Sequence, residues 1–214
     1  DLIHASDTLI FEISKKQGIR SVDKICHRME LGKDTYTLGK IRPEMEEELC
    51  RVLADFVRIM EGYRVDDYRA TASSAISEAS NSLYVLGKIH QLTGLSVTVL
   101  SNSEQRFLSY KALAAMEDNF NKIIEKGTAI LDLDGGSFQI SLFDKDALVT
   151  TQNIRMGSLR IRERLAGIQS ETEHYEEMVE ELIWNEVSSF KKMYLKDRKI
   201  ENIMLIGDVF TDSV

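Results

Sequence analysis

Proline, cysteine and histidine are scarce in this sequence of 214 residues, which has one proline, two cysteines and four histidines. Cys26 and Cys50 are too few for a disulfide framework and indicate reduced thiols in a cytoplasmic protein. The histidines are isolated and the cysteines lack metal-binding spacing, so no zinc site is predicted. The common nucleophile-elbow, P-loop and dinucleotide-binding glycine motifs are also missing from the sequence.

Long apolar runs and an excess of basic residues are absent as well. No run of about 18 apolar residues occurs, so no segment is expected to span a membrane, and no signal peptide is evident. The formal net charge is −8 at pH 7, which argues against general binding of nucleic acid or anionic membranes. Hydrophobic residues make up 43% of the chain and predict a packed core.

Hydrophobic periodicity and turn residues predict an alternation of strands and helices. Pro43 is typical of a first helical turn, and Gly94 is typical of a helix end. Strands are predicted at residues 8–13, 19–31, 68–73, 96–100, 129–134, 137–143, 148–154 and 200–206, and helices at 43–62, 74–93, 103–116, 158–166 and 171–195. The order of strand, hairpin and helix occurs twice, which predicts two related α/β lobes, residues 1–116 and 117–214.

A turn of Asp134, Gly135, Gly136 and Ser137 joins two of the predicted strands. Glycine-rich turns of this kind can hold a phosphate on backbone N–H groups, whereas an ordinary Asp-Gly-Gly turn needs no ligand. Asp134 puts a carboxylate where a phosphate would come closest. Asp132 and Asp134 stand two residues apart at a strand end and point to the same face, so the pair is also a candidate Mg²⁺ site.

Four stretches follow one another at consistent spacing: ATASSAISEASN from Ala70, TGLSVTVLSNSEQRFLSYKAL from Thr93, ILDLDGGSFQISLF from Ile130 and IRMGSLRIRERL from Ile154. In this respect the chain resembles the exopolyphosphatase and guanosine pentaphosphate phosphatase (Ppx/GppA) family over nearly its whole length. The resemblance implies an α/β fold of two actin-like (ribonuclease H-like) lobes, with mixed sheets flanked by helices and the second lobe incomplete. It also implies a bacterial, cytoplasmic phosphoanhydride hydrolase with polyphosphate or guanosine pentaphosphate as ligand, Mg²⁺ as cofactor and a homodimer as one form of assembly.

The resemblance further assigns site residues. Phosphate-binding positions of the family fall on Ser6, Ser77, Gly135, Gly136, Ser137 and Gly207. The catalytic glutamate of the family falls on Gln105, and the neighbouring Glu104 is the substitute that the sequence offers. The acid that helps to hold the metal falls on Gln139, which joins Asp132 and Asp134 as a candidate Mg²⁺ ligand.

Several of these positions depart from the residue types of the family. The stretch Asp1-Leu2-Ile3-His4-Ala5-Ser6 stands in place of an Asp-x-Gly-Ser-Asn-Ser loop around a phosphate, with Ile3 for glycine and Ala5 for asparagine. Ser77 replaces an arginine that reaches a phosphate, which removes a charge-assisted hydrogen bond of about 1.5–3 kcal/mol. Asp134 replaces the first glycine of the second loop and sets a negative charge against an anion.

The catalytic positions have changed in the same direction. An amide cannot accept the proton of an attacking water, so Gln105 cannot act as the general base, a role worth roughly 10²–10⁴-fold in rate. Glu104 is displaced from it by about 100° around a helix and is expected to face away. Gln139 likewise lacks the charge that holds a metal.

The sequence therefore predicts a Ppx/GppA-like phosphatase that is catalytically impaired. The alternative is a non-catalytic binding or scaffold protein, a pseudophosphatase, that uses the cleft between the lobes or an outer surface. An ATP-dependent, kinase-like member of the superfamily is the third reading, and it is disfavoured because no adenosine-loop signature is evident at Ile206-Gly207-Asp208.

Overall fold

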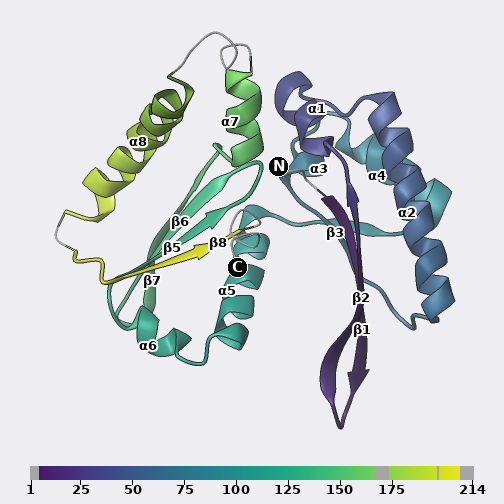
Figure 1. Ribbon diagram of the computed structural model, residues 1–214, viewed down its shortest axis with the longest axis horizontal. Coiled ribbons are helices and arrows are strands. Elements are labelled where there is room, and N and C mark those ends of the chain that lie inside the picture. Colours follow the sequence, from purple (N-terminus) through teal and green to yellow (C-terminus); the bar gives the residue numbers. More distant parts are fainter. Residues whose placement is uncertain (1–4, 167–173, 197, 208–214) are drawn as a thin grey trace. The chain divides into compact units, whose positions relative to one another are not determined.

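The structure, a computed structural model, describes residues 5–166, 174–196 and 198–207 of the chain. Two compact units divide between Leu100 and Ser101, and Figure 1 labels the elements of each. Within the described ranges, no helix combines the length and the apolar character needed to cross a membrane.

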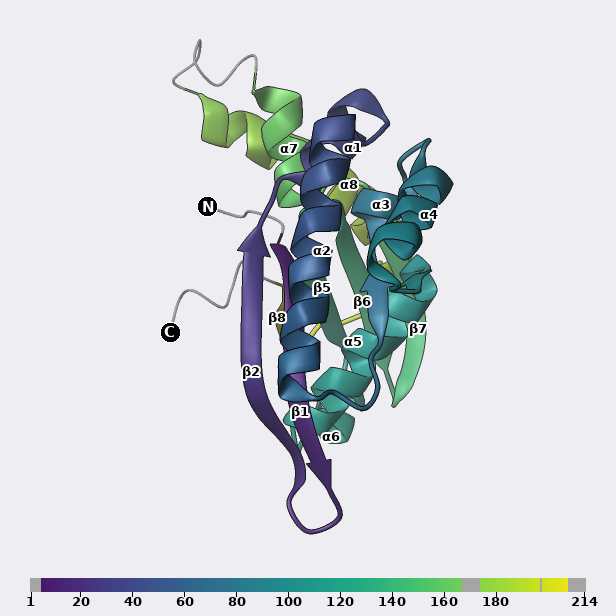
Figure 2. The ribbon, with the colours of Figure 1, turned by 90° about the vertical axis from the view of Figure 1, so that its right-hand side faces the viewer.

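The first unit combines a hairpin, a short strand pair and several helices. Its elements are β1 (Ala5–Ser14), β2 (Gly18–Arg28), α1 (Leu31–Leu38), α2 (Pro43–Tyr63), β3 (Ala70–Ala72), α3 (Ser74–Ser77), α4 (Ser82–Thr93) and β4 (Val97–Val99). Strands β1 and β2 pair antiparallel, and β3 pairs with β4 in parallel. Figure 2 shows the long hairpin beside α2. Apolar side chains of α2 and α4, among them Leu49, Val85 and Ile89, form the centre of the core.

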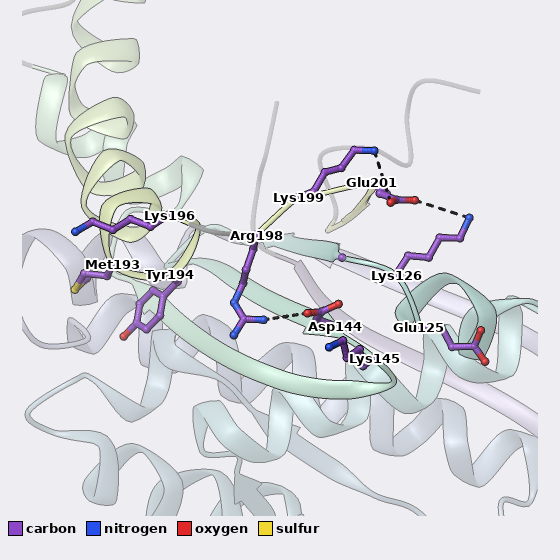
Figure 3. A pocket seen from close by; sticks show the side chains of 11 residues that line it. Glu125, Lys126, Asp144, Lys145, Met193, Tyr194, Lys196, Arg198, Lys199 and Glu201 are labelled. Carbon is purple, nitrogen blue, oxygen red and sulfur yellow. Dashed lines mark hydrogen bonds and ion pairs between the residues drawn. The ribbon is translucent and has the colours of Figure 1, made fainter.

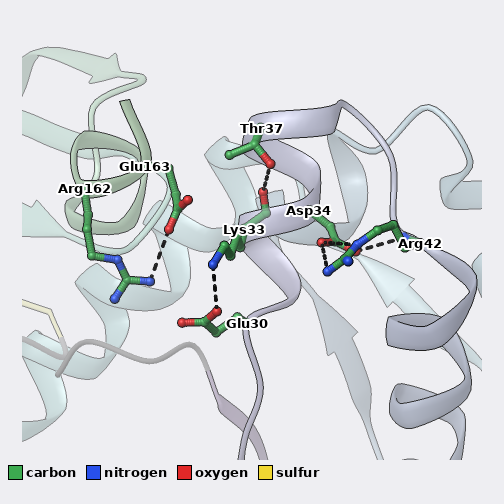
Figure 4. Close-up of polar contacts among 7 residues, drawn as sticks. All are labelled: Glu30, Lys33, Asp34, Thr37, Arg42, Arg162 and Glu163. Carbon is green, nitrogen blue, oxygen red and sulfur yellow. Dashed lines mark hydrogen bonds and ion pairs between the residues drawn. The ribbon is translucent and has the colours of Figure 1, made fainter. Parts of the chain in front are cut away.

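A buried carboxylate fixes the entry to α2. Asp34 of α1 is 2% exposed and accepts the backbone N–H of Arg42 at 3.0 Å and the guanidinium Nε–H of the same residue at 2.9 Å (Figure 4). The hydrogen bond to Asp34 raises the pKa of Arg42. Arg42 is the residue before Pro43, so this ion pair holds the chain where the predicted proline start of the helix begins.

The predicted single helix at residues 74–93 is wrong, because the chain breaks it into α3 and α4. The side chain of Asn81 bonds the backbone of Ile41 twice, as acceptor from its N–H at 3.0 Å and as donor to its carbonyl at 2.8 Å. The N–H of Ser80 donates to the carbonyl of Gly39 at 2.9 Å. These tertiary bonds take the place of helical ones at the break. Helix α1, directly after β2, was also not predicted.

The second unit is built on a mixed sheet of β5 (Thr128–Leu133), β6 (Phe138–Asp144), β7 (Ala147–Ile154) and β8 (Asn202–Ile206) in the order β7-β6-β5-β8. Strand β8 is parallel to β5, and the other neighbours are antiparallel. Its helices are α5 (Asn102–Met116), α6 (Phe120–Ile124), α7 (Ser158–Leu165) and α8 (Tyr175–Tyr194). Figure 1 shows α5 and α6 on one face of this sheet and α8 on the other. Residues 171–173 of the predicted last helix lie outside the described residues.

Two apolar clusters cover the two faces of the sheet. Phe120 and Ile124 of α6 pack with Ile130 on one face, together with Tyr110 and Leu113 of α5. On the other face, Phe190 of α8 packs against a separate group of sheet side chains, Ile140, Leu142 and Ile154. Helix α5 therefore belongs with the second unit, although the sequence pattern grouped residues up to 116 with the first.

Candidate functional site

The loop that follows β5 folds around the carboxylate of Asp134. Its Oδ1 atom accepts the backbone N–H of Gly136 at 2.7 Å and that of Ser137 at 2.6 Å. The backbone N–H of Asp134 in turn donates to the carbonyl of Ser137 at 3.1 Å. Successive backbone N–H groups that point to one spot form an anion-binding concavity. In this loop the anion is a side chain of the loop itself.

Helix α7 holds the same loop through its backbone. The N–H of Ser158 donates to the carbonyl of Asp134 at 3.0 Å, and the Nε–H of Arg160 donates to the carbonyl of Gly136 at 2.9 Å. Gly157 allows this close approach, because a Cβ there would lie 2.4 Å from the carbonyl carbon of Gly135. The loop is thus fixed in the conformation in which Asp134 fills the concavity.

A small pocket lies between this loop and the start of α5. It brings together most of the second-unit residues that the sequence singled out, and its lining residues are Asn102, Gln105, Arg106, Asp132, Asp134, Ser137, Gln139 and Asn153. Asp132, Gln139 and Asn153 stand side by side on β5, β6 and β7. The pocket volume is about 10 Å³, about the space that one water molecule needs.

Arg106 is a pocket residue that the sequence reasoning missed. Its guanidinium donates to the hydroxyl of Thr151 at 3.3 Å and to that of Ser103 at 3.1 Å. The available signal was its place next to Gln105, one helical turn after the Ser101 cap. Asn102 and Asn153 were missed in the same way, because neither carries a motif.

Further hydrogen bonds join α5 to the sheet below the pocket. Ser109 donates to Oδ2 of Asp132 at 3.2 Å, and the Tyr110 hydroxyl donates to Ser141 at 2.5 Å. Burial raises the pKa of Tyr110. These contacts fix α5, which carries Gln105, against β5 and β6.

Glu104, the predicted substitute for the catalytic glutamate, has a structural role at the start of α5. Its carboxylate accepts the backbone N–H of Ser101 at 2.9 Å and the Ser101 hydroxyl at 2.8 Å, while Ser101 accepts the Glu104 N–H. This reciprocal capping box satisfies donors that a helix start leaves open. Glu104 is not among the pocket-lining residues, and Gln105 is.

The pocket residues do not fit a hydrated Mg²⁺ ion. Mg²⁺ requires near-octahedral oxygen ligands and usually keeps several waters, whereas the space here is about 10 Å³. Oδ1 of Asp134 is already bonded to two N–H groups, and Arg106 brings a positive charge into the same pocket. Among the described residues, no group of three or more His, Cys, Asp and Glu side chains is placed to hold a metal.

The remaining predicted phosphate positions are placed as follows. Ser6 and Ser77 belong to the first unit, where the Ser6 hydroxyl donates to the sulfur of Met29 at 3.2 Å and Ser77 ends α3. Gly207 follows β8 with a φ of +130° and approaches β5 so closely that an added Cβ would lie 2.0 Å from the carbonyl oxygen of Leu133. Ile3 lies outside the described residues.

Comparison with known proteins gives the family. Residues 9–213 match the model of the Ppx/GppA phosphatase family. The bifunctional 3-dehydroquinate synthase/phosphatase of Fusobacterium nucleatum is 20% identical over 162 residues, 73% of this chain and 24% of that protein. Exopolyphosphatase 1 of Mycobacterium leprae is 29% identical over 108 residues, 50% of this chain and 30% of that protein. The crystal structure of the Aquifex aeolicus member of the Ppx/GppA family matches with a TM-score of 0.66 and 19% identity, over 94% of this chain and 62% of that one.

The chain spans less than a third of the curated relatives that it matches and about 62% of the crystal structure. The structural match confirms the predicted α/β class and actin-like fold. Because the family model covers nearly every residue, the chain belongs to the Ppx/GppA phosphatase family.

Proposed function

We propose that this chain is a Ppx/GppA-family protein with impaired phosphoanhydride hydrolysis, because its phosphate cradle is occupied by its own carboxylate. The observation that carries the proposal is the pair of hydrogen bonds from the N–H groups of Gly136 and Ser137 to Oδ1 of Asp134, at 2.7 and 2.6 Å. A phosphate at this loop would compete for the same donors.

The energetic balance disfavours the phosphate. A hydrogen bond to a charged group contributes about 1.5–3 kcal/mol. The carboxylate is tethered two and three residues from its donors, so it competes at a high effective concentration. Asp132 adds a second negative charge to the pocket, and Arg106 balances only one of the two. An incoming phosphate therefore meets both a filled cradle and a net negative charge.

The chemistry of the pocket points the same way. Hydrolysis of a phosphoanhydride needs a group that accepts a proton from the attacking water, and the amides of Gln105 and Gln139 cannot do so. In phosphoryl transfer most of the rate enhancement comes from positioning and charge stabilisation. The cradle that would position the phosphate and the carboxylate that would activate water are both altered.

The substrate class follows from the family. The similarity to exopolyphosphatase 1 of Mycobacterium leprae supports polyphosphate as the ancestral substrate of this pocket. Guanosine pentaphosphate is the second candidate substrate, because the chain belongs to the Ppx/GppA family. The non-catalytic alternative, a pseudophosphatase that binds a partner, is compatible with the same cradle geometry.

The test is phosphate release from long-chain polyphosphate and guanosine pentaphosphate with Mg²⁺. We expect the protein to release no more phosphate than Gln105→Ala, the matched variant that lacks any side-chain acceptor at this position. Gln105→Glu alone should gain less than about tenfold, because the cradle remains filled. The combination of Gln105→Glu, Ser77→Arg, Asp134→Gly and Gln139→Glu should gain more.

Two results would count against the proposal. Turnover in the ordinary enzyme range, about 1 s⁻¹ or faster, would show that the cradle accepts substrate as it stands. A gain of about a hundredfold from Gln105→Glu alone would show that Asp134 does not block the site.

A further inference from the structure

Two hollows of the second unit differ in how their charged side chains meet water. One is an open groove of about 770 Å³ beside the start of β5 and the end of α8 (Figure 3). Its ion pairs, Arg198 with Asp144 at 3.0 Å and Lys126 with Glu201 at 3.8 Å, are at least 30% exposed, so water screens them. The pocket beside Asp134 instead has its charges around a space of about 10 Å³, where the sign of each charge decides what can enter.

The walls of the Asp134 pocket offer the oxygen atoms that a hard divalent cation prefers. Asp132, Gln139 and Asn153 stand side by side on β5, β6 and β7. Gln105 of α5 lines the same pocket. Carboxylate and amide oxygens are ligands for both Mg²⁺ and Ca²⁺. The types of donor therefore do not explain why the pocket disfavours such an ion, and its charge has to be considered.

The chain itself compensates each carboxylate of the pocket. The Asp134 carboxylate accepts two backbone N–H groups of its own loop, at 2.7 and 2.6 Å. The Asp132 carboxylate accepts the hydroxyl of Ser109 at 3.2 Å and shares the pocket with the guanidinium of Arg106. A guanidinium is protonated at every ordinary pH, so this positive charge is permanent. A divalent cation would enter beside it, and like charges at such close range repel each other strongly.

The half-buried Arg106 side chain is held in place from two sides. It donates to the hydroxyl of Thr151 on β7 at 3.3 Å and to that of Ser103 on α5 at 3.1 Å. Thr151 shares a hydrogen bond with Ser141 at 3.1 Å, and Ser141 accepts the hydroxyl of Tyr110 at 2.5 Å. This run of hydroxyl groups leads from the sheet back to α5, so the guanidinium has a defined position in the pocket wall.

We propose that Arg106 determines the ion selectivity of this pocket, because its guanidinium takes the place of a divalent cation beside Asp132. The chain carries its own counter-charge, and the pocket excludes Mg²⁺ and Ca²⁺ without needing either ion to hold its acidic residues together. The proposal concerns metal binding alone. It is independent of the impaired hydrolysis proposed above, which rests on the bonds of Asp134 and on the amides of Gln105 and Gln139.

The test is titration of the isotope-labelled protein with MgCl₂ and, separately, with CaCl₂, because Ca²⁺ accepts less regular coordination than Mg²⁺ does. NMR follows the side-chain amide signals of Gln105, Gln139 and Asn153, which all line the pocket.

Three variants separate the charge of Arg106 from its size. Arg106→Ala removes both the charge and the bulk of the side chain, whereas Arg106→Lys keeps the charge on a slimmer side chain. Lys111→Gln is the matched control, because it removes one positive charge from an exposed position of the same helix outside the pocket. Circular dichroism checks that each variant is folded. Arg106→Gln, which keeps a donor for Thr151, replaces Arg106→Ala if the latter is unfolded.

In the parent protein, in Arg106→Lys and in Lys111→Gln, we expect no saturable shift of the three signals up to about 10 mM of either cation. This limit is about ten times the dissociation constant of the weakest protein Ca²⁺ sites, about 10⁻³ M. In Arg106→Ala, all three signals should shift and saturate with at least one of the two cations, with a dissociation constant of about 1 mM or lower. Binding thus tightens at least about tenfold relative to the parent.

The proposal is overturned if the three signals of the parent show a saturable shift in this range, or if the neutral variant binds neither cation. It is also overturned if Arg106→Lys or Lys111→Gln binds as tightly as Arg106→Ala, because the charge of Arg106 would then not be the cause. None of these results changes the expected phosphate release, which is measured separately.

Discussion

The contribution of the Asp134 carboxylate to the stability of its loop can be tested by removing it. In Asp134→Ala, the N–H groups of Gly136 and Ser137 lose an acceptor at 2.7 and 2.6 Å. A hydrogen bond to a charged group contributes about 1.5–3 kcal/mol. Because Asp134 is half-buried and water can reach part of the loop, water replaces part of what is lost. We therefore expect the two hydrogen bonds together to contribute about as much as one such bond, in the lower part of that range. The free energy of unfolding should fall by about 2 kcal/mol, which corresponds to a lower Tm by about 4–8 °C for a chain of this size.

Asp134→Asn is the matched variant, because its amide oxygen can still accept from the same N–H groups without the charge. We expect it to lose about 1 kcal/mol, since neutral hydrogen bonds contribute about 0.5–1.5 kcal/mol. Urea unfolding followed by circular dichroism measures both values. If Asp134→Ala unfolds at the same urea concentration as the parent, the carboxylate does not hold the loop and the reasoning fails.

Two further predictions concern packing and pH. Gly157→Ala should destabilise the protein by about 2–3 kcal/mol, because a Cβ would lie 2.4 Å from the backbone of Gly135. Gly87→Ala in α4 should stabilise it by about 0.5–1 kcal/mol, because nothing lies within 4 Å of a Cβ there. If urea unfolding ranks the two variants in the opposite order, the local packing described here is contradicted. Burial raises the pKa of Cys50 and Tyr110, and the hydrogen bond to Glu46 raises that of Lys88. The folded state thus holds these protons more tightly than the unfolded chain, so stability should be constant at neutral pH and fall above about pH 8.5. Tyr110→Phe should make that fall shallower above about pH 10, and an unchanged slope would show that Tyr110 does not contribute.

Local signals in the sequence were sufficient for most of the fold. Pro43 and Gly94 placed helix boundaries correctly, because each acts on its own neighbours in the chain. The break between α3 and α4 was not predictable in this way, since Asn81 is drawn from the helix by the backbone of Ile41, which is 40 residues away.

The residues of the candidate site also fall into those that local patterns predicted and those that depend on tertiary contacts. Spacing and family resemblance identified Gln105, Asp132 and Gln139, and the structure brings all three to one pocket. The sequence also raised the question of a carboxylate at position 134, but only the geometry shows which donors it takes. Arg106 depended on the way α5 lies against β7, through Thr151, and no local pattern reports such a contact.

The most direct measurement of the central claim is the response of the Gly136 and Ser137 amide signals to added phosphate, recorded by NMR on isotope-labelled protein. In the parent protein these N–H groups are bonded to Asp134, so their signals should not shift as phosphate is added. In Asp134→Gly the cradle is open, and the same two signals should shift and saturate. A saturable shift of both signals in the parent protein, at the same phosphate concentration as in Asp134→Gly, would contradict the account.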